Sequence, residues 1–322
     1  MRQNRIGILA LQETHLTKKA LDEVNRTYKK QMVIIQSSDP DNTGSKGVAF
    51  ALNKRLVAWE ETKTKELEPG RALLLTIPWR NQGKTITALA VYAPNIQKEN
   101  ERFWNDLDNK YFEGGVPRPD ILLGDFNMVE EPIDRLPPHG DAIASVERLR
   151  ALKDRLHLFD GWRQENPTKP RYTYVQDGSG SQSRIDRIYA TKDFMENSRG
   201  WTSIISGIAT ADHRVVIAQF FDPGSPFIGK GRWAMPETIL SDPEFIKFAT
   251  KKGLEAVESA KTRNVQEALA TYKLQINGEA RDIIKRNYPK IQERLDNLQN
   301  DLEKILDSPT MAPQDKRKSS AA

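Results

Sequence analysis

The sequence predicts an α/β or α+β layered domain with substantial antiparallel pairing, followed by an all-helical C-terminal segment. Short apolar runs rich in β-branched and aromatic residues alternate with polar loops from Ile6 to about Phe221. The helical patterns between these runs are too few to give every strand a crossover helix, which disfavours a purely parallel sheet. After a cluster of turn formers from Asp222 to Pro226, strand signals vanish and helix formers dominate.

The elements of the first region follow from this periodicity in chain order. Helical patterns occupy Lys18–Arg26, Lys98–Phe112 and Ser145–Leu156. The expected strands are Ile6–Leu11, Met32–Ile35, Gly47–Leu52, Ala72–Ile77, Thr85–Val91, Ile121–Leu123, Ile185–Tyr189 and Arg214–Phe220.

Four parts follow from these patterns: a domain at 1–222, a linker at 223–236, a helical segment at 237–307 and a disordered tail at 308–322. Apolar residues from Ile284 to Ile305 are spaced alternately four and three, which is the seam of a coiled coil over 284–305. Pro289 is expected to break or start a helix there. Self-association through this helix and packing on neighbouring helices of the same chain both remain open.

The composition excludes some kinds of functional site but does not identify the function. The 322 residues include 49 Lys and Arg against 44 Asp and Glu, so the formal charge is +5. This mild excess permits contact with a polyanion such as DNA but provides no basic binding arm. The chain contains no cysteine, which excludes disulfides, zinc thiolate sites and cysteine nucleophiles. With no signal-peptide core near the start and no membrane span, a nuclear or cytoplasmic location is expected.

Polar side chains with metal and proton chemistry follow several of the strands. Glu13 lies where the first strand leaves the sheet, and hard divalent ions such as Mg²⁺ prefer oxygen ligands of this kind. Asp125 and Asn127 alternate with Phe126, so both side chains face one side while the ring packs behind them. A carboxylate accepts a proton from water, and an amide fixes the nucleophile or a phosphate oxygen.

Asp186 lies inside an otherwise apolar strand, where an unpartnered carboxylate would cost roughly several kcal/mol. His213 is its expected partner. Such a pair would hold the imidazole in one orientation and favour its protonated form, which donates a hydrogen bond to a phosphoryl oxygen. The other histidines are interpreted as structural; they are His15, His139 and His157.

The ordered set of motifs resembles the endonuclease/exonuclease/phosphatase family over roughly residues 5 to 221. The set comprises Gln12-Glu13-Thr14-His15, Tyr92-Ala93-Pro94-Asn95, Gly124-Asp125-Phe126-Asn127, Arg184-Ile185-Asp186-Arg187-Ile188 and Asp212-His213. Each motif is weak alone, but the combination is specific. The resemblance implies a four-layer sandwich of two mixed sheets flanked by helices, with the motifs gathered at one end of the sheets.

The resemblance also implies roles for these residues. Glu13 and Asp212 would bind Mg²⁺, with Mn²⁺ as an alternative ion. Asp125 would activate the attacking water, Asn127 would orient it, and His213 would contact the phosphate while paired with Asp186. Tyr92 would touch the phosphate with Asn95 nearby. From the residues themselves, we expect Arg184 and Arg187 to reach substrate phosphates, with surface ion pairs as the alternative. We expect Trp162 and Tyr174 to pack in the core, with stacking on bases as the alternative.

One departure from the family pattern is expected to matter. Family members begin with a strand that carries a metal-binding asparagine, whereas here the Gln-Glu-Thr-His strand follows directly after Met1. We therefore expect a truncated domain. Beyond the domain, the stretches Gly229–Pro236 and Ile239–Phe245 are similar to the spacer between endonuclease and reverse transcriptase in LINE-like (non-LTR) retrotransposon polyproteins.

The leading expectation is a metal-dependent endonuclease that nicks DNA and leaves a 3′-hydroxyl. The alternatives are a phosphatase or an abasic-site endonuclease of the same fold. A third alternative, from another class, is a catalytically weak truncated relic that only binds nucleic acid or self-associates.

Overall fold

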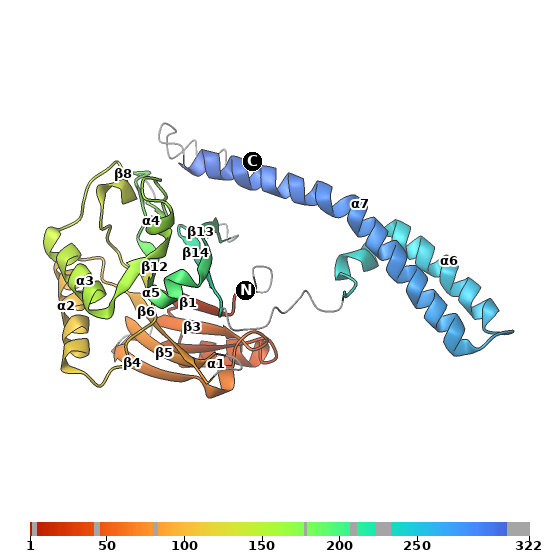
Figure 1. The fold of residues 1–322 in the computed structure, drawn as a ribbon, viewed down its shortest axis with the longest axis horizontal. Helices are drawn as coiled ribbons and strands as arrows, with labels where there is room; N and C mark the ends of the chain where they lie inside the picture. The colour runs from red at the N-terminus through yellow and green to blue at the C-terminus, as the bar shows by residue number, and fades with distance from the viewer. Residues whose placement is uncertain are drawn as a thin grey trace. The chain divides into compact units, whose positions relative to one another are not determined.

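The computed structural model describes residues 1, 5–41, 46–79, 83–176, 179–206, 211–222 and 233–307. The chain divides into two compact units, Met1–Gly224 and Ser225–Ala322 (Figure 1). The expected tail at 308–322, and most of the expected linker at 223–236, lie outside the described residues.

The first unit is built on a six-stranded mixed sheet with the strand order β4-β5-β6-β7-β12-β9. Strands β6 and β7 are parallel, and every other neighbouring pair in this sheet is antiparallel. The strands are β4 (Lys63–Glu68), β5 (Ala72–Pro78), β6 (Thr85–Tyr92), β7 (Ile121–Asp125), β12 (Asp186–Thr191) and β9 (Leu158–Asp160). The expected mixture of strands with mostly antiparallel pairing is confirmed.

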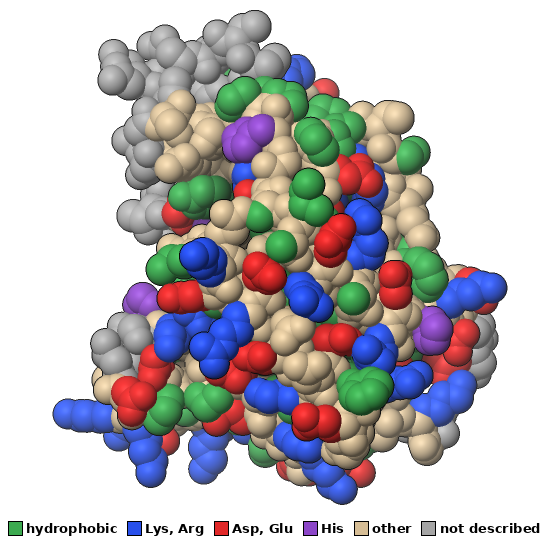
Figure 2. Space-filling model, turned by 90° about the vertical axis from the view of Figure 1, so that its left-hand side faces the viewer, with side chains coloured by type: hydrophobic (Ala, Val, Ile, Leu, Met, Phe, Trp, Pro, Cys, Tyr) green, Lys and Arg blue, Asp and Glu red, His purple; other side chains and the backbone are tan. Residues whose placement is uncertain are grey.

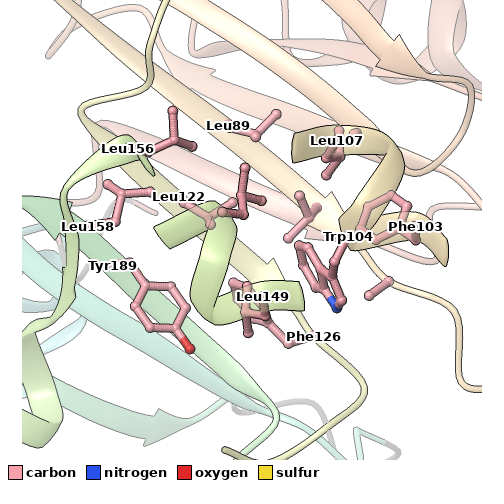
Figure 3. Close-up of a cluster of buried hydrophobic side chains, with 14 of the residues drawn as sticks. Leu89, Phe103, Trp104, Leu107, Leu122, Phe126, Leu149, Leu156, Leu158 and Tyr189 are labelled. Carbon is pink, nitrogen blue, oxygen red and sulfur yellow. The ribbon is translucent and has the colours of Figure 1, made fainter. Parts of the chain in front are cut away.

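Helices α2 (Gln97–Glu113) and α3 (Ile143–Leu156) cover one face of this sheet (Figure 3). Both present an apolar stripe to the strands, as helices on a sheet require. Leu89 and Leu122 on the sheet meet Trp104 and Leu149 on the helices, and all four side chains are fully buried. This is the deepest part of the core.

The opposite face is covered by two separate groups of strands. One is the sheet β1-β3-β2, made of β1 (Ile8–Gln12), β3 (Val48–Asn53) and β2 (Met32–Ser37); the other is the hairpin of β13 (Ser198–Ile205) and β14 (Arg214–Phe220). Phe50 of β3 and Leu75 of β5 belong to the core between the layers. Helix α1 (Lys18–Thr27) packs on the outer face of β1-β3-β2. The four-layer sandwich that the resemblance implied is confirmed.

Strands β1 and β14 each have one hydrogen-bonded neighbour in the part of the chain that the structure describes, β3 and β13 respectively. Both strands are apolar on their two faces, a pattern typical of strands in the middle of a sheet. Every residue of β1 is nevertheless only half-buried. Leu123, in the centre of the six-stranded sheet, is also only half-buried.

Shorter elements complete the first unit. A three-stranded sheet has the order β10-β11-β8, made of β10 (Tyr174–Val175), β11 (Gln182–Ser183) and β8 (Arg135–Leu136). The short helices are η1 (Trp59–Glu61), η2 (Pro132–Asp134), α4 (Gly161–Glu165) and α5 (Lys192–Glu196).

The second unit is helical, as expected, and contains η3 (Glu237–Ser241), α6 (Pro243–Ser259) and α7 (Val265–Asp307). Phe245 on α6 packs with Ala280 and Ile283 on α7. Helix α7 runs through Pro289, so the expected break there is wrong. A proline in a helix interior costs about 3 kcal/mol, and the long runs of helix formers on both sides offset that cost.

Two of the seam residues beyond Pro289 are exposed. Leu295 and Leu298 are 48% and 59% exposed. The coiled coil and self-association therefore stay predictions. None of the helices in the described ranges is long and apolar enough to cross a membrane.

Candidate functional site

The ladder between β7 and β12 places two carboxylates side by side. Asp125 ends β7 and Asp186 begins β12, and the two residues are direct partners across the antiparallel pair. Gly124 precedes Asp125 with φ of +141°, and a Cβ there would lie 2.0 Å from the carbonyl oxygen of Val91. Only glycine allows this close approach, so the glycine of the Gly-Asp-Phe-Asn motif sets the position of Asp125.

Phe126 anchors the turn that follows Asp125. Its ring is fully buried and stacks on Trp104, with the ring centroids 5.3 Å apart. The expectation that this ring packs behind Asp125 and Asn127 is therefore confirmed. Asn127 has φ of +48°, in the left-handed region, which asparagine adopts more readily than most residues other than glycine.

Two hydrogen bonds hold Asn127 in that conformation. Its backbone N–H donates to Asp125 Oδ1 at 2.8 Å, and its side-chain Nδ2 donates to the carbonyl of Ala93 at 2.8 Å. The amide is thereby fixed between the Asp125 turn and the end of β6. This is the fixed orientation that positioning a small nucleophile requires.

His213 pairs with Asp186, as the sequence predicts. Its Nδ1 lies 2.8 Å from Asp186 Oδ2, which leaves Nε2 for another partner. The backbone N–H of Asp186 donates to Thr173 Oγ1 at 3.0 Å, so the acid is itself held in place. The Tyr174 ring lies 4.8 Å from the His213 ring.

The Tyr174 contact corrects the assignment of this tyrosine to the core. Tyr174 is half-buried and forms an isolated β-bridge with His213, the residue that precedes β14. Local sequence does not reveal this contact, because 38 intervening residues separate the two positions. Trp162 does pack in the core between the layers, as expected.

The electrostatics of the pair and of Asp125 follow from burial and from neighbouring charges. Burial disfavours the imidazolium form of His213, but the hydrogen bond and negative charge of Asp186 outweigh it and raise the pKa of His213 to about 9. Burial and the nearby Asp186 carboxylate raise the pKa of Asp125 to about 8, despite the N–H of Asn127. Two acids thus share a site where an added cation would favour ionisation of both.

One atom each from Asp125, Asp186 and His213 lie within 4.8 Å of one another. Carboxylate oxygens suit a hard divalent ion, and a cation next to Asp125 and Asp186 would offset their mutual repulsion. The donor set therefore fits such an ion. This group does not contain Glu13 or Asp212, whose assignment as metal ligands stays a prediction.

Glu13 and Tyr92 meet on the other side of Asp125. The Tyr92 hydroxyl donates to Glu13 Oε1 at 2.5 Å, and Tyr92 is the partner of Asp125 in the parallel β6–β7 ladder. Burial, followed by the hydrogen bond to Glu13, raises the pKa of the Tyr92 hydroxyl. Glu13 itself is exposed, with φ of +49°. The structure thus gathers Glu13, Tyr92 and Asp125, which are far apart in the sequence.

Arg71 is a residue that the sequence did not reveal. Its Nη1 donates to the carbonyl of Tyr92 at 3.1 Å, and its guanidinium lies 5.3 Å from the centre of the Tyr92 ring. Nothing near Arg71 in the sequence distinguishes it from other surface arginines. The remaining predicted residues are both exposed. Asn95 lies in the loop that follows Tyr92, and Asp212 directly precedes His213.

Arg184 and Arg187 do not have the role predicted for them. Arg184 is 4% exposed and binds Asp134 at 2.7 Å and 2.9 Å and Asp160 at 2.7 Å. Arg187 is 1% exposed and donates to the carbonyl of Met128 at 2.8 Å. A guanidinium that is buried and hydrogen-bonded inside the protein does not reach a phosphate at the surface. Both arginines hold the framework of the site instead.

Comparisons with known proteins bear on the family and the fold of the chain. The family model for the endonuclease/exonuclease/phosphatase family matches residues 1–218. The "Transposon TX1 uncharacterized 149 kDa protein" of Xenopus laevis is 32% identical over 253 residues, which are 77% of this chain and 18% of that protein. The chain thus spans about a fifth of the length of this curated relative.

Solved structures share the fold of the first unit. An AP endonuclease from Archaeoglobus fulgidus superposes with a TM-score of 0.55 at 21% identity, covering 68% of this chain and 90% of that one. The 3′-5′ exonuclease NExo from Neisseria meningitidis does so with a TM-score of 0.55 at 20% identity, covering 68% and 91%. With the ordered motifs and the family match over two thirds of its length, this chain belongs to the endonuclease/exonuclease/phosphatase family.

Proposed function

We propose that the chain is a divalent-metal-dependent endonuclease of the non-LTR retrotransposon type that nicks DNA and leaves a 3′-hydroxyl. The observation that carries the proposal is the joint placement of Asp125, Asp186 and His213 within 4.8 Å, beside Asn127. The similarity to a transposon protein supports the retrotransposon type. A nuclear or cytoplasmic site of action is part of the proposal.

In this proposal, Asp125 activates the water molecule that attacks the phosphate. The Asp125 carboxylate accepts a proton from the attacking water, which Asn127 orients, and a cation held at the acids would favour this ionised form of Asp125. Mg²⁺, or Mn²⁺, would be held by carboxylate oxygens, with Glu13 and Asp212 as the proposed ligands. When bound, the ion stabilises negative charge on the phosphate.

The histidine supplies the complementary charge. Asp186 keeps His213 protonated, and its free Nε2–H donates to a phosphoryl oxygen as negative charge develops. Tyr92 and Asn95 border the same position and contribute further hydrogen-bond donors. The chemistry is an in-line displacement at phosphorus, which requires positioned donors rather than a covalent intermediate.

The first test is nicking of supercoiled plasmid by the purified chain in Mg²⁺. The matched controls are the Asp125→Ala, His213→Ala double variant and addition of EDTA. Conversion to open circles that both controls abolish, with 3′-hydroxyl ends that a polymerase extends, is the expected result. Absence of nicking by a chain with the circular dichroism of the folded protein would contradict the proposal. Activity confined to phosphomonoesters or abasic sites would favour the alternatives.

A further inference from the structure

Two exposed isoleucines lie at the starts of neighbouring helices. Ile96 precedes α2 and is 57% exposed, and Ile143 begins α3 and is 75% exposed. Their helices meet there, because the buried Ser145 hydroxyl donates to the carbonyl of Gln97 at 3.2 Å. A single exposed apolar side chain is common, but here the starts of two helices that meet each carry one. We call these two residues the isoleucine pair.

A buried amide fixes the first isoleucine relative to the candidate site. Asn100 donates to the carbonyl of Pro94 at 2.8 Å and to that of Phe126 at 2.9 Å. Trp104 Nε1 donates to Asn100 Oδ1 at 2.8 Å, so the whole amide is saturated. Phe126 stands between Asp125 and Asn127, and Pro94 is two residues before Ile96. The loop that carries Ile96 is therefore tied directly to the turn that carries the acid.

The second isoleucine is fixed in a similar way. The backbone N–H of Val129 donates to Asp141 Oδ2 at 2.7 Å, two residues after Asn127 in the chain. Arg135 binds both oxygens of Asp141 at 2.8 Å each. Since Asp141 is two residues before Ile143, the start of α3 is held at the same corner. The pair is exposed and yet rigidly mounted.

Such a pair has a known use against duplex DNA. Proteins that deform DNA insert Ile, Leu, Phe or Met between base steps, and flexible pyrimidine–purine steps resist this least. We infer that the isoleucine pair is a wedge that contacts a base step beside the scissile phosphate and selects deformable steps. This inference rests on the proposed function, because it names how that site would choose its substrate.

The surrounding charges agree with a site that relies on shape. On the face shown in Figure 2, Lys and Arg side chains are interspersed with Asp and Glu, and hydrophobic side chains occur singly or in small groups. Exposed Lys98 and Arg102 follow Ile96 on α2 and are available to flanking phosphates. Non-specific attraction is then modest, and the contacts next to the scissile bond decide where cutting occurs.

The test compares the wild-type chain with the double variant Ile96→Ala, Ile143→Ala. Phe112→Ala is the control, since Phe112 is 73% exposed about four turns further along α2. Three substrates are used: duplexes with TA and CA steps, duplexes with A-tracts, and the small diester bis(p-nitrophenyl) phosphate. Fluorescence of 2-aminopurine within the duplex, measured in EDTA, reports unstacking on binding without cleavage.

We expect the double variant to lose the preference for flexible steps and about tenfold in kcat/KM on duplex DNA, the effect of roughly one lost base contact. Hydrolysis of the small diester should stay within twofold, and Phe112→Ala should match the wild type. Unchanged step preference and unchanged 2-aminopurine fluorescence in the double variant would overturn the wedge. If the wild type cleaves no substrate, the proposed function fails, and 2-aminopurine fluorescence alone decides the wedge.

Discussion

The two β-layers of the first unit differ in how firmly they hold their share of the site. The six-stranded sheet is continuous, and its central strands β7 and β12 carry Asp125 and Asp186 in adjacent register. The opposite layer is divided into β1-β3-β2 and the β13–β14 hairpin, and it supplies Glu13 after β1 and His213 before β14. Backbone hydrogen bonds thus fix the two acids, whereas packing between layers brings Glu13 and His213 to them.

A single site therefore depends on two kinds of support. Changes in the continuous sheet should affect chemistry and stability strongly. Changes in β1 and β14 of the divided layer should have smaller effects on stability, because these two strands are mostly half-buried.

The substitution Asp125→Asn should have the largest effect on activity. It removes the proton acceptor but keeps an oxygen for the N–H of Asn127, so nicking should fall by about 10³-fold, within the range for loss of a general base. In EDTA at pH 9, the melting temperature should rise, because the variant no longer places a carboxylate beside Asp186. Nicking assays and thermal unfolding measure the two effects. An active variant would contradict the role of Asp125.

The substitution Arg184→Ala should have the largest effect on stability. It removes the buried guanidinium that Asp134 and Asp160 share and leaves Arg163 as the remaining partner of Asp134, which costs about 3–5 kcal/mol of the free energy of unfolding. Lys192→Ala is the control, since its ion pair with Glu196 is exposed and contributes at most about 1 kcal/mol. Urea denaturation measures both. If Arg184→Ala raised KM for DNA with no loss of stability, the phosphate-binding prediction for Arg184 would be restored.

A pair of leucines compares the layers directly. Leu122→Ala in β7 removes a fully buried side chain and should cost about 2–5 kcal/mol. Leu9→Ala in β1 removes a half-buried one and should cost about half as much. Urea denaturation of the two variants gives the ratio. Equal losses would show that the divided layer is packed as firmly as the continuous sheet.

The pH dependence of stability should show the smallest effect. The pKa of His213 rises from its ordinary 6.5 to about 9 on folding, so its stabilising contribution is complete below pH 6.5 and is lost as the pH rises through 9. The pKa of Asp125 rises to about 8 on folding, so this residue also lowers the stability of the folded protein as the pH rises above about 4. In EDTA, the melting temperature should fall by about a few degrees between pH 6.5 and 9.5. Asp186→Asn should flatten this dependence, whereas a flat wild-type profile would contradict the pairing.

Periodic sequence patterns predicted the elements that bury an apolar face. Strands β5, β6 and β7 were expected almost as observed, as were helices α1, α2 and α3. Strand β4 was missed because its sequence, Lys-Thr-Lys-Glu-Leu-Glu, is mostly exposed at the edge of the sheet. The long strand β13 was missed for a similar reason, since its partner β14 rather than an apolar face determines it.

In the site, local motifs predicted the acids and the histidine but not the arginines. Arg184 flanks Asp186 in sequence, yet its partners Asp134 and Asp160 lie 50 and 24 residues away. The same limit hid Arg71, whose position beside Tyr92 depends on the β5–β6 ladder. Residues that act through long-range ion pairs leave no periodic trace in the sequence.

The edge of β1 that faces away from β3 has a practical consequence for handling the protein. Within the described ranges no strand pairs with this edge, and β1 is apolar and lacks the proline, lysine or bulge that usually protects such an edge. Concentrated solutions of the protein should therefore form edge-to-edge aggregates. A lysine in place of the half-buried Leu9 should therefore improve the solubility of the protein.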